Sequence, residues 1–283
     1  MLSGPDAQEN ISARLGPSGE LAHNQLMKLA RVILRVQSPE NLACFYVEHL
    51  GMTVFDEGCA VLLGFGGEGA LIEMRPAMPG NRYTHRRSDR YWKIGITLPN
   101  VDMACAQLRK AGVEVSQPRQ FGEIGYMCHL EDPEGFSIEL LQHRFGAHRA
   151  QGDGDPAEPL GGGARVGQIT LRVANLDAAL GFYRDCLGMT LLSIQPVPNY
   201  GFTLYFLAFT EERPPIADLE AVGNREWLWQ RPYTTLEFQH FNGAATAFTL
   251  PVEDAAGFGG IAITAERTEW LEDDDGGLVK LQA

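Results

Sequence analysis

Residues 32–52 read VILRVQSPENLACFYVEHLGM, and residues 169–189 read ITLRVANLDAALGFYRDCLGM. The two stretches align without a gap, and they share Leu-Arg-Val, Phe-Tyr and Gly-Met at identical offsets. A self-match of this length indicates a duplicated structural unit rather than chance. The repeated phrase therefore predicts how the whole chain is organised.

Each copy has the same local pattern. An apolar run, Val32–Val36 or Ile169–Val173, predicts a strand. Apolar residues then recur at helical spacing, and each stretch ends before a glycine, as helices often do. Beta-branched and aromatic runs follow and predict further strands. The repeated unit is therefore a strand, a helix and several strands.

Two more diverged copies complete the pattern. Residues 91–142 contain a strand, a helix that ends at a glycine, and a hairpin around Asp132-Pro133-Glu134-Gly135. A fourth copy starts near Phe258 and is much too short, so we expect its helix and two strands to be missing. The organisation predicted is a disordered tail (1–27), a first domain (28–143, modules 28–76 and 91–142), a Gly- and Pro-rich linker (144–166) and a second domain (167–283, module 167–240 and remnant module 257–283).

Composition excludes several classes of partner. The net charge of -13 disfavours nucleic acid or an anionic membrane as a partner. The basic cluster His85-Arg86-Arg87 with Arg90 is the exception, and it is either a surface loop or an anion-binding loop. Met1–Asn10 carries no apolar signal core, and the five cysteines are scattered without zinc-ligand spacing. We expect a cytoplasmic protein.

These units resemble the βαβββ modules of the vicinal oxygen chelate superfamily, which includes glyoxalases, bleomycin-resistance proteins and extradiol dioxygenases. The phrase DPEGFSIELLQ (132–142) is similar to the closing hairpin of that family. GQITLRV (167–173), FYRDCLGMTLL (182–192), FTLYFLAF (202–209) and TTLEFQH (234–240) resemble the glyoxalase I (lactoylglutathione lyase) branch. The resemblance implies an α+β fold of tandem modules that form two cupped mixed sheets, with the fourth module truncated.

The resemblance also implies a divalent metal site, with ligands from the first and last strands of paired modules. In the cup made by the second and third units, the matching positions are Gln168, Glu237, Glu139 and Lys93. Three of these are the expected oxygen ligands for Zn, Ni, Mn or Fe. Lys93 stands where the family has a histidine; His129 or His240 could substitute for it.

Lys93 is a serious departure from the family pattern. An ammonium repels a dication and would instead bridge Glu139 and Glu237. In the cup made by the first and fourth units, the positions are Arg31, Glu73, Gly260 and Lys280. Two cations and one carboxylate do not suit a metal, so we expect a structural cup or one that accepts an anion.

The function implied is a metal-dependent lyase or isomerase that acts on a small oxygenated substrate, a glutathione adduct among the candidates, by proton transfer through an enediolate. Glu139 and Glu237 would be the catalytic carboxylates. The substrate-binding residues predicted are Arg172, Lys93, Phe202 and Leu204. The alternative is a metal-free small-molecule-binding protein that has lost catalysis. We also expect that the chain could form a homodimer.

Overall fold

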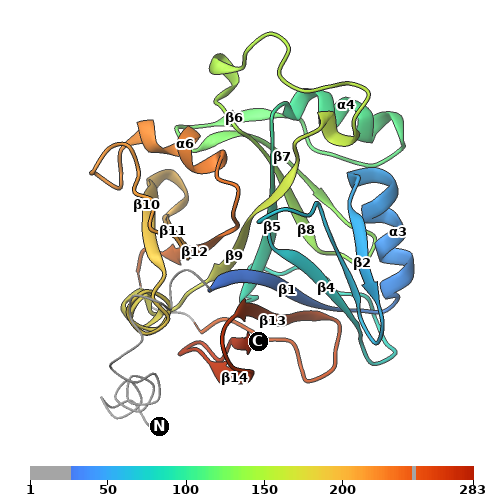
Figure 1. The fold of residues 1–283 in the computed structure, drawn as a ribbon, viewed down its shortest axis with the longest axis vertical. Helices are drawn as coiled ribbons and strands as arrows, with labels where there is room; N and C mark the ends of the chain where they lie inside the picture. Colours follow the sequence, from blue (N-terminus) through green and yellow to red (C-terminus); the bar gives the residue numbers. More distant parts are fainter. Residues whose placement is uncertain (1–26, 244–246) are drawn as a thin grey trace.

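The chain folds into two mixed β-sheets, and Figure 1 shows their arrangement in a computed structural model that describes residues 27–243 and 247–283. One sheet has seven strands in the order β14-β15-β13-β1-β4-β3-β2. The other has eight in the order β10-β11-β12-β9-β5-β8-β7-β6. The predicted fold class is therefore confirmed. The predicted tail lies, apart from residue 27, outside the described residues.

The elements of the first half follow the predicted modules. The first unit contains β1 (Lys28–Val36), α3 (Pro39–Leu50), β2 (Thr53–Glu57), β3 (Val61–Gly64) and β4 (Leu71–Pro76). The second contains β5 (Tyr91–Leu98), α4 (Val101–Lys110), β6 (Arg119–Phe121), β7 (Gly125–Glu131) and β8 (Ser137–Gln142). The helix α3 ends at Gly51, whose φ of 74° is left-handed and suits a residue without a side chain.

The second half is less regular. The third unit contains β9 (Arg165–Arg172), α5 (Leu176–Leu180), a π-helical turn (Gly181–Cys186), β10 (Thr190–Val197), β11 (Phe202–Ala208), α6 (Arg225–Trp229) and β12 (Thr235–Phe241). Short 3₁₀ turns occupy Gly146–His148, Pro159–Gly161, Pro198–Tyr200 and Val222–Asn224. The fourth unit contains β13 (Gly257–Thr264), β14 (Glu269–Glu272) and β15 (Leu278–Gln282).

The fourth unit retains more strands than the sequence predicts. The expected loss of the helix agrees with the described residues between β13 and β14, where none forms. The expected loss of two strands is wrong, because Glu269–Glu272 forms β14 and pairs with β15. This strand is only four residues long and carries a glutamate at each end, so its sequence lacks an apolar run. Those charges suit an edge strand, because they oppose pairing with another chain.

The sheets join units that are not neighbours in sequence. The strand β5 of the second unit pairs with β9 of the third, and β1 of the first unit pairs with β13 of the fourth. Figure 1 shows β1, near the start of the chain, alongside β13, near its end. The expected pairing of units two and three in one cup, and of one and four in the other, is therefore confirmed. Buried residues of all four units, among them Val32, Ile94, Ile169 and Ile261, share one apolar core.

Helical residues connect the units in a different combination, the first with the second and the third with the fourth. Tyr46 of α3 donates a hydrogen bond of 2.8 Å to Asp132, in the closing turn of the second unit. Tyr183 occupies the equivalent place in the repeat and donates 2.7 Å to Asp273, in the closing turn of the fourth unit. Both tyrosines come from the repeated Phe-Tyr pair. Sheets therefore join units of different halves, and helices join units of the same half.

The segment between the halves is folded onto the molecule. Asn100 at the start of α4 donates to the carbonyl of Asp153, and Gln107 donates to the carbonyls of Pro156 and Glu158. Leu160 is fully buried. The two halves are thus held by contacts along residues 144–166 as well as by the sheets. No helix in the described part of the chain is long and apolar enough to span a bilayer.

Candidate functional site

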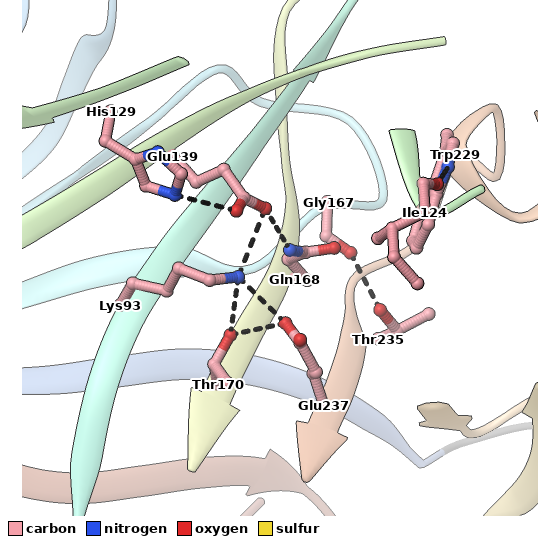
Figure 2. Close-up of polar contacts among 10 residues, drawn as sticks. All are labelled: Lys93, Ile124, His129, Glu139, Gly167, Gln168, Thr170, Trp229, Thr235 and Glu237. Atoms are coloured by element: carbon pink, nitrogen blue, oxygen red, sulfur yellow. Dashed lines mark hydrogen bonds and ion pairs between the residues drawn. The ribbon is translucent and has the colours of Figure 1, made fainter. Parts of the chain in front are cut away.

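The ammonium of Lys93 lies at the centre of the eight-stranded sheet's polar site (Figure 2). Its Nζ is 3.1 Å from Glu139 Oε1, 3.0 Å from Glu237 Oε2 and 3.2 Å from Thr170 Oγ1. Lys93 is 2% exposed, Glu139 4% and Glu237 1%. An ammonium has three N–H donors, so these three acceptors occupy all of them.

The register of four adjacent strands brings these residues together. Gln168 on β9 lies opposite Gly95 on β5, and Gly95 lies beside Glu139 on β8. Thr170 on β9 lies beside Glu237 on β12. A Cβ at Gly95 would lie 2.2 Å from Gln168 Cγ, so the glycine leaves the space that Gln168 fills. Gln168 uses that space to donate a 2.7 Å hydrogen bond from Nε2 to Glu139 Oε1.

Burial and charge determine the protonation of this site. Burial lowers the pKa of Lys93, but attraction to Glu139 and Glu237 outweighs it and raises that pKa above its usual value. Burial raises the pKa of Glu139, yet the charge of Lys93 and the contact with His129 bring it down to about 2. Burial raises the pKa of Glu237. Two carboxylates face one ammonium, so the excess negative charge makes Glu237 the more easily protonated of the pair.

His129 connects this buried site to a cavity. Its Nε2 lies 3.0 Å from Glu139 Oε2, and the two residues are cross-strand partners on β7 and β8. The imidazole is 43% exposed, whereas the carboxylate it contacts is 6% exposed. Glu139 is thus held by Lys93 and Gln168 on one oxygen and by His129 on the other.

The cavity lies against the same face of the eight-stranded sheet and has a volume of about 390 Å³. This volume is in the range of small-molecule sites. Its lining is mostly apolar and aromatic, with basic residues among them: His85, Arg87, Trp92, Arg119, Phe121, Met127, His129, Glu139, Arg172, Tyr200, Phe202, Gln239 and Phe241. The sheet curls so far that Phe121 of β6 contacts Tyr200, before β11, with ring centroids 5.2 Å apart.

The inserted segment between β11 and β12 closes the sheet further. Trp229 on α6 donates from its indole to the carbonyl of Ile124, between β6 and β7, and stacks edge-on against Phe206. Arg225 donates to the carbonyl of Glu123. These contacts join the two edges of the sheet and make the cup deep.

Arg172 lies at the cavity but is held by the protein. Its Nε donates to Gln239, its Nη1 lies 2.8 Å from the carbonyl of Asp89, and its Nη2 contacts His85. The guanidinium also contacts the carbonyls of Arg86 and Tyr91. Burial lowers its pKa to about 10, so it stays charged at neutral pH. The arrangement makes Arg172 a brace for residues 85–91.

The remaining predicted residues have different surroundings. Phe202 lines the cavity. Leu204, two residues along the same strand, belongs to the same apolar cluster as Phe202 but is not among the lining residues. Four residues of the site were not predicted from the sequence: Thr170, Trp92, Arg119 and Phe121. Arg87 was indicated only as part of the basic cluster. Thr170 could have been found, because it lies two residues after Gln168 on a strand and so shares its face.

The predicted ligands converge, but their arrangement does not fit a divalent metal ion. Gln168, Glu139 and Glu237 surround one point, which Lys93 occupies. A dication 4 Å from the ammonium would be repelled by about 8 kcal/mol at an effective dielectric of 20. Gln168 presents its amide nitrogen to the site, and its oxygen is buried without a partner. Over 27–243 and 247–283, no cluster of three or more His, Cys, Asp or Glu residues suits a metal.

The first and fourth units present a different set at the corresponding place. Glu73 accepts a bond of 2.9 Å from Arg31 on one oxygen and contacts Arg75 on the other. The two guanidiniums lower the pKa of Glu73 despite its burial. Both carboxylate oxygens are therefore occupied by cations of this chain, as expected for a structural cup.

Two curled sheets, each assembled from two of the four repeated units, define this chain as a protein of paired modules that form cups. It belongs to the Glyoxalase/Bleomycin resistance protein/Dioxygenase superfamily, whose sequence profile matches residues 28–140 and 165–271. Among solved structures, glyoxalase I from Zea mays has a TM-score of 0.65 at 19% identity and covers 90% of this chain and 92% of its own. That likeness shows the fold.

Curated relatives point to the same branch. A probable chloroplastic lactoylglutathione lyase of Arabidopsis thaliana is 26% identical over 209 residues, 69% of this chain and 54% of that protein. The match thus spans about half the length of that relative. A lactoylglutathione lyase of Schizosaccharomyces pombe is 25% identical over 214 residues, 66% of this chain and 68% of that protein. These similarities support a glyoxalase-like function at the level of the family.

Proposed function

We propose that this chain is a glyoxalase-like protein that binds a small organic molecule without a metal ion. The binding site is the cup that the second and third units form from the eight-stranded sheet, called the two-three cup below. The observation that carries the proposal is the position of Lys93, which contacts Glu139 and Glu237 at 3.1 and 3.0 Å. Its ammonium supplies the positive charge that a cation would otherwise supply to the two carboxylates. The cup keeps its shape and polarity without an added ion.

The cavity above the Lys93 site supports ligand binding. It is lined by aromatic rings and has room for a small molecule. Glu139 holds the exposed His129 in a fixed orientation at the cavity surface. In this proposal Lys93 keeps the base of the cup in place, His129 presents a polar group to the ligand, and the aromatic residues bind its apolar part.

A second candidate is the metal-dependent lyase implied by the family. The convergence of Gln168, Glu139 and Glu237 favours it, because these are the residue types expected at those positions. The names of the relatives favour a glutathione adduct as its substrate. This candidate requires that Lys93 moves or loses its proton, against the raised pKa that its two carboxylate neighbours produce.

Metal content separates the two candidates. The wild-type protein is incubated with Ni²⁺, Zn²⁺ or Mn²⁺, desalted and measured by plasma mass spectrometry. We expect well below one ion per chain and no turnover of methylglyoxal with glutathione. Lys93→His is expected to bind about one ion per chain, because it replaces the ammonium with a neutral ligand. Lys110→His, on the exposed end of α4, is the matched control and should bind no more than the wild type.

The wild-type measurement decides the proposal even if a variant fails to fold. One ion per wild-type chain that is lost in Glu237→Gln would overturn the metal-free cup and establish the second candidate. Circular dichroism of each variant shows whether a low metal content reflects the site or an unfolded chain.

A further inference from the structure

The cavity of the two-three cup has a charge opposite to that of the whole chain. The chain carries a net charge of -13, yet, of the described residues that line the cavity, three are arginines and Glu139 alone is acidic. Lys93 compensates the charge of Glu139 from below. The cavity is therefore a cationic site in an acidic protein, and its field attracts anions.

Two of these arginines have no acidic partner among the described residues. Within the described part of the chain, Arg87 and Arg119 form no ion pair, whereas the third, Arg172, is saturated by backbone carbonyls, Gln239 and His85. Both side chains are exposed at the cavity. His85 adds no charge at neutral pH, because burial and the nearby Arg172 lower its pKa. The charge available to a ligand is thus that of Arg87 and Arg119.

Each unpaired guanidinium lies near an aromatic ring of the cavity wall. Arg87 is 4.9 Å from the ring centre of Phe241, and Arg119 is 5.9 Å from that of Phe121. Phe202 lies between them in the wall, with its ring 5.8 Å from Phe241 and 6.3 Å from Tyr200. The cavity wall therefore carries a run of aromatic rings with an arginine at each end. A ligand with a flat apolar body and an anionic group satisfies both.

We propose that the two-three cup binds an aromatic organic anion, whose ring system stacks on Phe202 and its neighbours while Arg87 and Arg119 bind the anionic group. This inference rests on the proposed function, because it names the class of ligand for the same cup. The inference also gives a role to the basic cluster at residues 85–90, which the sequence alone allowed to be either a surface loop or an anion-binding loop. His85 and Arg87 of that cluster line the cavity.

A pair of fluorescent probes tests the inference. The probes are 1-anilinonaphthalene-8-sulfonate and N-phenyl-1-naphthylamine, which share one aromatic body and differ in the sulfonate. We expect the sulfonate to bind the wild-type protein about tenfold or more tightly than the neutral amine, as charge-assisted hydrogen bonds allow. Equal affinity for the two probes, or no binding of either, overturns the inference.

Variants test whether the two probes bind in the two-three cup. Arg87→Ala with Arg119→Ala should weaken the sulfonate about tenfold and leave the amine within about threefold. Arg87→Lys with Arg119→Lys should restore part of the difference. Phe202→Ala should weaken both probes. Arg213→Ala is the control, because Arg213 is exposed and, within 27–243 and 247–283, its side chain donates to the carbonyls of Glu211 and Glu212 alone.

The outcomes separate this inference from the metal-free proposal. Sulfonate binding that neither the arginine pair nor Phe202→Ala weakens would mean that the probe binds elsewhere, and would overturn the ligand class. One metal ion per chain would overturn the metal-free cup but would leave the comparison of the two probes intact. The altered arginines are exposed, so circular dichroism should show the wild-type fold in every arginine variant.

Discussion

Lys93 Nζ lies 3.0 Å from Glu237 Oε2, and both side chains are almost entirely excluded from water. Removal of one partner from a buried ion pair leaves an uncompensated charge. We therefore expect Lys93→Met to lower the free energy of unfolding by about 3–5 kcal/mol at pH 7, measured by urea denaturation. A loss below about 1 kcal/mol would mean that water or a bound ion reaches the carboxylates.

A double variant separates charge from packing. In Lys93→Met with Glu237→Gln, one carboxylate of the site is neutralised. If uncompensated charge causes the loss, the double variant should recover much of the stability that Lys93→Met removes. If lost packing causes it, the two losses should add.

Asp132 should make the protein more stable as the pH falls below neutral. Burial raises its pKa from 3.8 to about 6, despite hydrogen bonds from Tyr46 and from the backbone of Phe136. The folded state thus binds the proton more tightly than the unfolded state. Stability from this group is complete below about pH 3.8 and is lost as the pH rises through about 6.

The matched variant is Asp132→Asn, which cannot titrate. Unfolding free energies measured between pH 7 and pH 4 should rise more for the wild type than for this variant. The difference should be on the order of 2–3 kcal/mol, the amount linked to a shift of about two units. If the unfolding free energies of the two proteins change equally between pH 7 and pH 4, another group causes the pH dependence of stability.

The equivalent substitution in the other half, Asp273→Asn, should destabilise the protein more than Asp132→Asn at pH 7. Asp273 pairs with the buried Arg90 at 2.5 Å and also accepts from Tyr183. In contrast, Asp132 forms no ion pair within residues 27–243 and 247–283. We expect Asp273→Asn to cost about 3 kcal/mol in urea denaturation, because Arg90 loses a buried partner. Asp132→Asn should cost much less or stabilise the protein, and equal losses would contradict the structural difference.

Arg172 should act on stability more than on ligand binding. Its donors hold backbone carbonyls of the segment before β5, and it is 3% exposed. Arg172→Met should therefore lower the free energy of unfolding by about 2–4 kcal/mol in urea denaturation. Arg35→Met is the repeat-equivalent control, and its half-buried guanidinium should matter less. A stable Arg172→Met protein that has lost anion binding would make Arg172 a ligand-binding residue.

The repeated phrase predicted the duplicated unit, because equivalent residues in each copy perform equivalent tasks, whereas the two cupped sheets were implied by the resemblance to the superfamily. Tyr46 and Tyr183 bind the closing turns of adjacent units, and Gly51 and Gly188 end the same helical segment. The convergence of Gln168, Glu139 and Glu237 was implied by their match to the ligand positions of the family. The bridging role expected for Lys93 also agrees with its contacts.

The cavity wall could not be predicted in the same way. Arg119 and Phe121 belong to β6, a strand of three residues that has no periodic pattern. Their place in the site depends on the curl that brings Phe121 to Tyr200. Phe202 and Leu204 share one face of a strand, but only Phe202 lines the cavity, and the strand pattern does not distinguish them. The partners of Arg172 come from residues 85–91, a contact that depends on tertiary structure.

Each cup is completed by one chain, because its two units come from different halves of the same molecule. Neither sheet needs a second copy to supply a unit. The homodimer suggested by the sequence stays a prediction. Sedimentation equilibrium would test it.

The pairing of β1 with β13 sets the order in which this protein can be built during synthesis. The partner strand of Lys28 ends at Thr264, so the ribosome must make most of the chain before the first sheet can gain its remaining strands. Until then one edge of β1 stays unpaired, and pairings this distant form slowly. Until the fourth unit is made, the newly synthesised first half therefore has an unpaired strand edge and exposed apolar surface, which favour aggregation.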